Sequence, residues 1–176
     1  MKKIIVILLG IFLLVGCTDT TNTPSRKVED YLSKYQKMDD DVITQLDLTL
    51  DNDTSMDEDQ KKEYKSLMQK QYQNLSYKIT DEKIEDDKAN VDVEIEVYDY
   101  QTSINKAKAY FEEHKEELMK DKKDEEKAYI DYKIEQMKKV SDKANYDITF
   151  NLTKKDGKWT VDDLTDADRQ KLHGLY

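Results

Sequence analysis

The residue best placed for acid–base chemistry in this sequence is an aspartate at the end of an alternating run. Apolar residues at every second position from Val91 to Val97 predict a strand with one buried face. Continuing the alternation places Asp99 on that face, between Tyr98 and Tyr100. Burial favours the protonated form of a carboxyl group, so a buried Asp99 could act as a general base. If the strand leaves the core or bulges at this point, Asp99 is exposed and has no such role.

Several tyrosines have spacings that would bring them near this position. Tyr31 and Tyr35 lie four residues apart, on the apolar face of a predicted helix. Together with Tyr98 and Tyr100 they could line a ligand pocket beside Asp99. The alternative is that these rings belong to the core, with each hydroxyl at its rim.

Other catalytic groups are scarce. His114 falls between Phe111 and Leu118 on the apolar face of a predicted helix, where a boundary role is expected, and His173 is expected in a frayed C-terminal tail. No group of His, Cys and Asp has the spacing of metal ligands, so neither a metal site nor a cofactor is predicted. Four glycines cannot supply a phosphate-binding loop and a nucleophile elbow.

An acidic segment over residues 51–59 places oxygen-bearing side chains at alternate positions, as calcium loops do. Met56 stands where a calcium loop has its turn glycine, and Lys62 stands where it has its bidentate glutamate. Ser55 and Glu58 have the spacing of a capping box at the start of a helix. A helix cap is therefore predicted here, and weak calcium binding remains the alternative.

The start of the chain has the organisation of an export signal. Lys2 and Lys3 precede an apolar run over residues 4–14, which ends shortly before Gly16 and Cys17. The run is shorter than the roughly 20 apolar residues of a membrane-spanning helix. Cys17 is the only cysteine in the chain.

This arrangement resembles the lipobox of bacterial lipoprotein signal peptides. The resemblance implies that the thiol of Cys17 is alkylated with diacylglycerol, carrying acyl chains such as palmitate, and that residues 1–16 are then removed. Two acyl chains anchor a protein stably, whereas one binds only marginally. Residues 17–23 then form the lipidated cysteine with a polar spacer, and residues 24–176 form a single extracytoplasmic domain. An ordinary secretory signal or a short anchor with a chance cysteine is the alternative.

Composition limits the class of partner. Of the 176 residues, 39% are charged, and the formal net charge is -10. Such a surface repels phosphate backbones and anionic headgroups, so nucleic acid is excluded as a partner. Apolar residues recur at helix and strand periods, which is typical of a folded domain.

The elements expected along the chain give an α+β fold. They are a helix from Pro24 that continues or kinks near Met38, a helix opened by the capping box at Ser55 that carries Tyr64 to Leu75, a hairpin with strands from Tyr77 and Ala89, helices over residues 104–119 and 124–140, a second hairpin across Lys155-Asp156-Gly157, and a helical tail after Leu164.

Three motifs carry a resemblance over residues 24–163: Thr23-Pro24, the tyrosine-rich first helix, and the turn Asp156-Gly157-Lys158-Trp159. The pattern resembles nuclear transport factor 2-like and cystatin-like domains, as found in small, mostly uncharacterised lipoproteins of Gram-positive bacteria. The resemblance implies N-terminal helices packed on a curled, cone-like antiparallel sheet of two hairpins, with a helical pair inserted between them. A plain helical layer on an antiparallel sheet is the simpler alternative.

The function expected from these features is a non-catalytic binding or interaction module. The lipobox resemblance places it on the outer face of the cytoplasmic membrane of a Gram-positive-type bacterium, anchored by the diacylglycerol on Cys17. Its partner would be a protein, a peptide or a cell-wall component. A cone-fold small-molecule-binding protein or enzyme with Asp99 as base is the second hypothesis, and a purely structural surface protein is the third.

Overall fold

A computed structural model describes residues 21–120 and 122–176, which form seven helices and four strands. The elements are α1 (Pro24–Lys37), α2 (Asp40–Asp51), α3 (Glu58–Gln73), β1 (Ser76–Glu85), β2 (Lys88–Tyr98), α4 (Tyr100–Glu113), α5 (Lys115–Leu118), α6 (Glu125–Lys138), β3 (Lys143–Lys155), β4 (Lys158–Val161) and α7 (Asp166–His173). The predicted α+β class is confirmed, as is the helical pair between two hairpins.

The strands pair antiparallel in the order β1-β2-β3-β4. Both predicted hairpins are present, with two-residue turns at Asp86-Asp87 and Asp156-Gly157. Asp86, Asp156 and Gly157 all have positive φ, which the tight hairpin turn requires. Along β2 and β3 every second side chain is buried, from Val91 to Val97 and from Ile148 to Leu152. One face of the sheet is therefore apolar and the other is wet.

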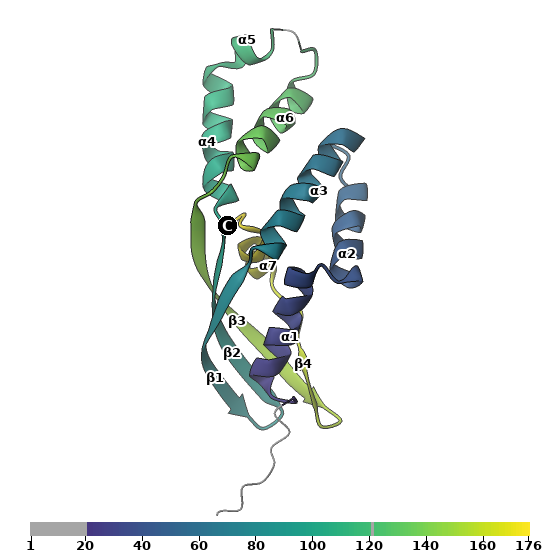
Figure 1. Ribbon diagram of the computed structural model, residues 1–176, viewed down its shortest axis with the longest axis vertical. Coiled ribbons are helices and arrows are strands. Elements are labelled where there is room, and N and C mark those ends of the chain that lie inside the picture. Colours follow the sequence, from purple (N-terminus) through teal and green to yellow (C-terminus); the bar gives the residue numbers. More distant parts are fainter. Residues whose placement is uncertain (1–20, 121) are drawn as a thin grey trace, which may run out of the picture.

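The sheet is twisted but uncurled, so the expectation of a curled sheet was wrong (Figure 1). Sheet curvature is produced by β-bulges and by glycines within strands. The strands contain no glycine, and the pairing registers show a single irregularity, between Ile79 and Asp81 of β1. In addition, β4 has only four residues and pairs with just one end of β3.

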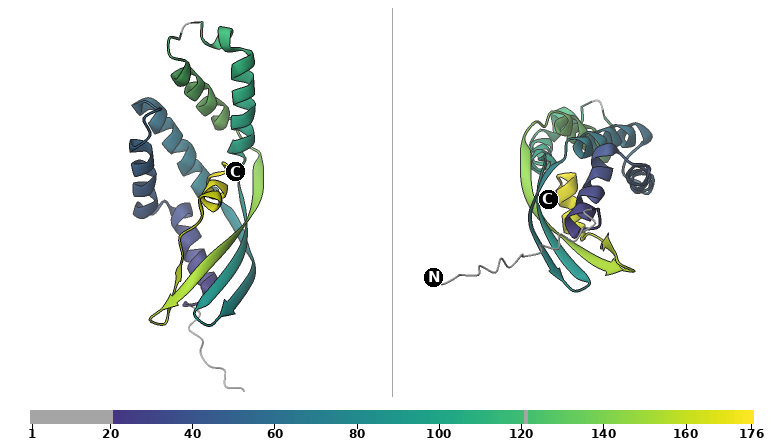
Figure 2. Two further views of the ribbon diagram at one scale, coloured as in Figure 1. Left: turned by 180° about the vertical axis from the view of Figure 1, so that it is seen from behind. Right: turned by 60° about the horizontal axis from the view of Figure 1, so that its bottom comes forward.

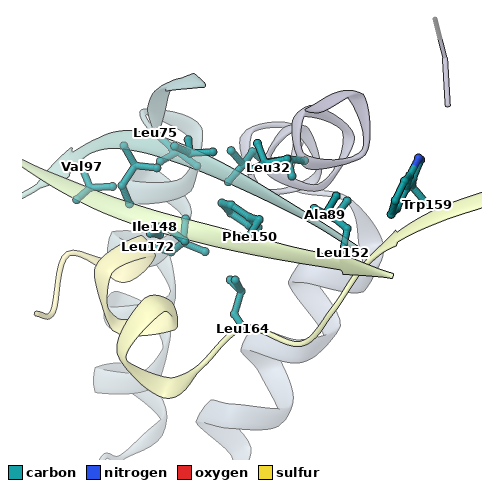
Figure 3. Close-up of a cluster of buried hydrophobic side chains, with 14 residues drawn as sticks. Leu32, Leu75, Ala89, Val97, Ile148, Phe150, Leu152, Trp159, Leu164 and Leu172 are labelled. Carbon is teal, nitrogen blue, oxygen red and sulfur yellow. The ribbon is translucent and has the colours of Figure 1, made fainter. Parts of the chain in front are cut away.

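The apolar face of the sheet is covered by α1 and α7 (Figure 2). Figure 3 shows Leu32 of α1 and Leu172 of α7 on either side of Phe150, which is fully buried. Trp159 extends this core toward the end of the sheet, and Leu164 lies near Phe150 on the α7 side. The C-terminal segment was expected to fray, and this was wrong: Leu172 is buried, so α7 is part of the core.

A second core lies among α2, α3, α4 and α6. Its largest members include Met68 of α3, Tyr100 of α4, and Ile134 and Met137 of α6, all at most 1% exposed. Figure 1 shows α4 and α6 side by side, extending beyond the sheet and joined through α5 at their far end. We call this unit, residues 100–138, the arm.

The helix starts follow local capping chemistry. The hydroxyl of Thr23 accepts a hydrogen bond from the Arg26 amide at 3.2 Å and Pro24 occupies the first turn, as predicted. The capping box of α3 was predicted at Ser55 and Glu58, and it lies instead at Asp57 and Gln60. Ser55 is unavailable for that role because its amide and hydroxyl both donate to Asp53.

Residues 1–16 and Cys17, on which the lipoprotein prediction rests, lie outside the described residues. Within residues 21–120 and 122–176, none of the helices combines the length and apolar character needed to cross a membrane.

The first described residues are attached to the end of the sheet opposite the arm. The side-chain amide of Asn22 donates to the carbonyl of Gly157 at 2.8 Å, and its oxygen accepts from the Trp159 amide at 3.3 Å. Figure 1 shows the start of α1 beside the hairpin turns at one end of the long axis, with α5 at the other end.

Candidate functional site

A groove between α4 and α6 on the arm has a volume of about 390 Å³. Ligand pockets in proteins span roughly 300–1,000 Å³, so the groove is large enough for one small ring system. Its lining comes from one face of each helix and from the segment that joins α6 to β3. These residues are Thr102, Ser103, Lys106, Ala107, Tyr110, Tyr132, Gln136, Lys139, Val140, Ser141 and Asp142.

Aromatic rings form one part of this lining. Tyr110 and Tyr132 lie with ring centroids 5.7 Å apart and planes 17° from parallel. His114 stacks on Tyr110 at 3.9 Å, and its Nδ1 lies 3.0 Å from the Tyr110 carbonyl. The histidine was expected within a helix over residues 104–119, at the boundary of its apolar face, whereas it is the C-cap of α4. Tyr110 remains 44% exposed, which makes it one of the few large apolar side chains on the described surface.

Most of the polar side chains in the lining have no partner within the described residues. Within the described residues, no hydrogen bond or ion pair engages the side chains of Thr102, Ser103, Lys106, Gln136 or Asp142. Elsewhere on the surface, charged side chains commonly form pairs, such as Lys115 with Glu125 at 2.6 Å and Lys122 with Asp131 at 2.9 Å. The groove therefore offers both donors and acceptors to a ligand.

Asp99 is the N-cap of α4. Its carboxylate accepts a hydrogen bond from the Thr102 amide at 3.0 Å, and its own amide donates to the Asp142 carbonyl at 3.0 Å. The strand ends at Tyr98, so the alternation that predicted a buried position does not continue to Asp99. The carboxylate is partly exposed and is committed to a backbone amide, which is the arrangement of a structural cap.

We expect the two replacements of Asp99 to differ in stability for this reason. Asn caps a helix about as well as Asp, so Asp99→Asn should change the free energy of unfolding by less than about 0.5 kcal/mol. Asp99→Ala leaves the Thr102 amide without its acceptor and should cost about 1 kcal/mol. Urea denaturation followed by circular dichroism measures both. A clear stabilisation by Asn would contradict the cap and indicate a strained, functional carboxylate.

The four candidate tyrosines form two separate pairs. Tyr31 and Tyr35 have hydroxyl oxygens 3.4 Å apart and rings in contact. Tyr98 and Tyr100 stack with centroids 6.0 Å apart. Among the described residues, no hydrogen bond or ring contact joins one pair to the other.

The first pair contacts a further tyrosine and a histidine, and the sequence analysis did not predict these contacts. Tyr35 packs edge-on against Tyr72 of α3, whose hydroxyl lies 3.0 Å from Nε2 of His173 on α7. Burial lowers the pKa of His173 to about 4, helped by the positive charge of Arg169. Burial also raises the pKa values of Tyr31 and Tyr72 well above their usual range. These contacts join α1, α3 and α7, and Tyr31, Tyr72 and His173 are uncharged at neutral pH.

The second pair serves packing and charge placement. Tyr100 is fully buried, and its hydroxyl donates to the Leu67 carbonyl at 3.3 Å. The ring of Tyr98 is flanked by two ammonium groups, Lys143 at 3.9 Å and Lys70 at 4.7 Å from its centroid. Burial lowers the pKa of Lys143, and the neighbouring charge of Lys70 adds to this. The tyrosines therefore belong to the core and its rim.

A buried glutamine joins the two cores at the end of β2. Gln71 of α3 is fully buried, and its side chain bonds the Tyr98 backbone twice, accepting from the amide at 2.8 Å and donating to the carbonyl at 3.1 Å. Gly174 passes directly over this junction with φ +68°, and its carbonyl accepts from the Gln101 amide at 2.8 Å. The C-terminus of α7 is fixed to the start of α4 in this way.

The acidic loop does not gather its carboxylates. Hydrogen bonds from Ser55 hold the pKa of Asp53 below its usual value, and the Gln60 amide does the same for Asp57. Across residues 21–120 and 122–176, no cluster of three or more His, Cys, Asp or Glu side chains could hold a metal ion. The loop therefore acts as a helix start in the described structure.

The sequence analysis predicted the two helices that carry the groove, but it did not identify the groove. Tyr110 follows Ala109 and precedes Phe111, whereas Tyr132 lies between Asp131 and Lys133, and their periodicity does not separate a groove wall from an exposed helix face. A usable signal was the small Ala107 on the inner face of α4, which is buried and lets the helices approach.

Comparison of the chain with protein-family models, with curated proteins and with solved structures finds no match in any of the three.

Proposed function

We propose that the chain is a membrane-anchored extracytoplasmic binding module, held by lipid on Cys17, that presents the arm away from the membrane. One observation carries the second part of the proposal: the start of α1 and the tip of the arm lie at opposite ends of the long axis (Figure 1). A tether that enters at Asn22 would leave the hairpin turns nearest the membrane and the arm farthest from it. The lipobox resemblance at residues 14–17 supports the first part.

The groove on the arm supports binding over catalysis. It combines exposed rings with unpaired polar side chains, which is typical of recognition sites. Asp99, the candidate base, is engaged as a helix cap. The groove therefore supports the binding hypothesis, whereas the enzyme hypothesis depends on a carboxylate that serves as a helix cap.

A relationship to nuclear transport factor 2-like and cystatin-like domains is proposed only at the level of element order. Helices followed by a hairpin, a helical pair and a second hairpin support it. A shared cone is no part of this proposal, because the sheet is uncurled.

Orientation can be tested with two single-cysteine positions, since a lipidated Cys17 has no free thiol. Glu116→Cys lies in α5 at the arm tip and Lys155→Cys lies at a hairpin turn, and both native side chains are exposed. With a bulky, membrane-impermeant maleimide on wall-stripped cells, we expect the arm position to react several-fold faster. After detergent solubilisation the two rates should become equal.

The anchor is tested in the same strains with Cys17→Ala. We expect this change to release the chain to the medium or to leave an uncleaved precursor. Mature protein that still requires detergent would contradict the lipid anchor. Equal labelling of the two positions in intact membranes would contradict the orientation, whatever the anchor.

A further inference from the structure

We infer that the groove between α4 and α6 is a carbohydrate-binding site that takes one sugar ring of a glycan chain. This inference rests on the proposed function and names the ligand class of the same arm. It is carried by the juxtaposition of two nearly parallel tyrosine rings with a set of polar side chains that have no partner in the described structure.

The aromatic wall suits a sugar ring. The axial C–H groups of a pyranose present a weakly positive, apolar face, and the face of an aromatic ring carries negative potential. Tyr110 and Tyr132 line the groove with their ring planes 17° from parallel, and Tyr110 remains 44% exposed. The stack of His114 on Tyr110 and the contact of Phe111 with Tyr132 fix the rings before a ligand arrives. Fixed rings lose little conformational entropy on binding.

The polar lining suits hydroxyl groups. Each sugar hydroxyl both donates and accepts, so it needs mixed partners within reach. Thr102, Ser103 and Gln136 can do both, Lys106 donates and Asp142 accepts. These groups come from α4, α6 and the segment before β3, so they lie on more than one side of the groove.

Other ligand classes fit this groove less well. A lipid tail or other apolar molecule would bury these polar groups without partners, at a cost of about 1–3 kcal/mol for each group. A phosphate polymer would meet the carboxylate of Asp142, which lines the same groove as the ammonium of Lys106. A neutral, hydroxyl-rich ring satisfies both charges by hydrogen bonds.

The test is isothermal titration of the detergent-solubilised chain with three neutral tetrasaccharides: β-1,4-linked N-acetylglucosamine, cellotetraose and maltotetraose. We expect saturable binding of at least one. Tyr110→Ala should weaken that binding about tenfold or more because it removes a stacking face. Tyr176→Ala is the matched control, since Tyr176 is 56% exposed and does not line the groove. It should bind as the unchanged chain does.

A second variant separates recognition from folding. Lys106 is exposed and unpaired, so Lys106→Ala should leave the thermal melt unchanged while weakening the same binding several-fold. Failure of all three sugars to bind, or equal binding by the Tyr110→Ala and Tyr176→Ala chains, would overturn the carbohydrate site. Either result would leave the labelling test of orientation unaffected, so the two proposals can fail separately.

Discussion

Gly174→Ala is expected to lower the free energy of unfolding by about 3 kcal/mol or more. A left-handed backbone costs a residue with a Cβ about 1–2 kcal/mol, and Gly174 has φ +68°. Its Cβ would also lie 2.1 Å from the Tyr98 carbonyl oxygen and 2.2 Å from Nε2 of Gln71. Relieving that overlap must break the Gln71 hydrogen bond to Tyr98 or the Gln101 bond to Gly174. Both losses leave buried polar groups unpaired.

Gly157→Ala supplies the matched control for this prediction. Gly157 also has a positive φ, of +76°, but nothing lies within 4 Å of its Cβ position. We therefore expect it to cost only about 1–2 kcal/mol, which is the backbone term alone. Chemical denaturation of both variants at one pH gives the difference. Equal losses would mean that the backbone at Tyr98 moves aside freely, and would contradict the tight junction described here.

The second large effect is a loss of stability in mild acid that is caused by His173. Its pKa is about 4 in the folded chain and about 6.5 in the unfolded chain. Above pH 6.5 neither state binds the proton, so the histidine does not affect stability there. As the pH falls from 6.5 to 4, His173 binds a proton in the unfolded state but not in the folded state. Folding should therefore weaken over this window, by up to about 3 kcal/mol.

His173→Gln isolates this contribution. Glutamine can keep a hydrogen bond to the Tyr72 hydroxyl but does not titrate, so its stability should change little between pH 6.5 and 4. The lowered pKa values of Asp53, Asp57 and Asp131 cannot produce the effect, since their stabilising contribution is lost only below their usual value of 3.8. Thermal melts across this pH range compare the two chains. Parallel curves would show that His173 is not the group responsible.

Local patterns predicted the sheet and the first helix because each depends on neighbouring residues. Alternation on β2 and β3 reports one buried face, and Asp156-Gly157 has the backbone freedom that a two-residue hairpin needs. Thr23 and Pro24 start α1 by the same local logic. The capping box was misplaced by two residues because Ser55 and Asp57 both begin acceptable patterns. Two contacts favour Asp57: Ser55 donates to Asp53, and the side-chain amide of Gln60 donates to the distant Asp131 of α6.

The positions of Asp99 and His173 could not be predicted for a related reason. The role of Asp99 depends on where β2 ends, and that point is set by the Gln71 side chain, which takes both backbone groups of Tyr98. His173 was placed in a frayed tail because the last helix is short and mostly charged. Its partner Tyr72 lies 101 positions away, and no periodicity reports such a contact. The groove likewise needs two helices that meet only in the folded chain.

The attachment of Asn22 to the β3–β4 turn has a mechanical consequence. If the chain is held by lipid at one end and by a ligand on the arm at the other, tension runs along the whole domain. It would enter at Asn22, whose two hydrogen bonds to Gly157 and Trp159 share the load with α1. The tension would pass to the ligand through α4, which follows directly from β2 and whose Gln101 amide donates a hydrogen bond to the Gly174 carbonyl. The extensively paired β2–β3 ladder lies between these points, so tension from the tether reaches the two Asn22 hydrogen bonds before it reaches the ladder.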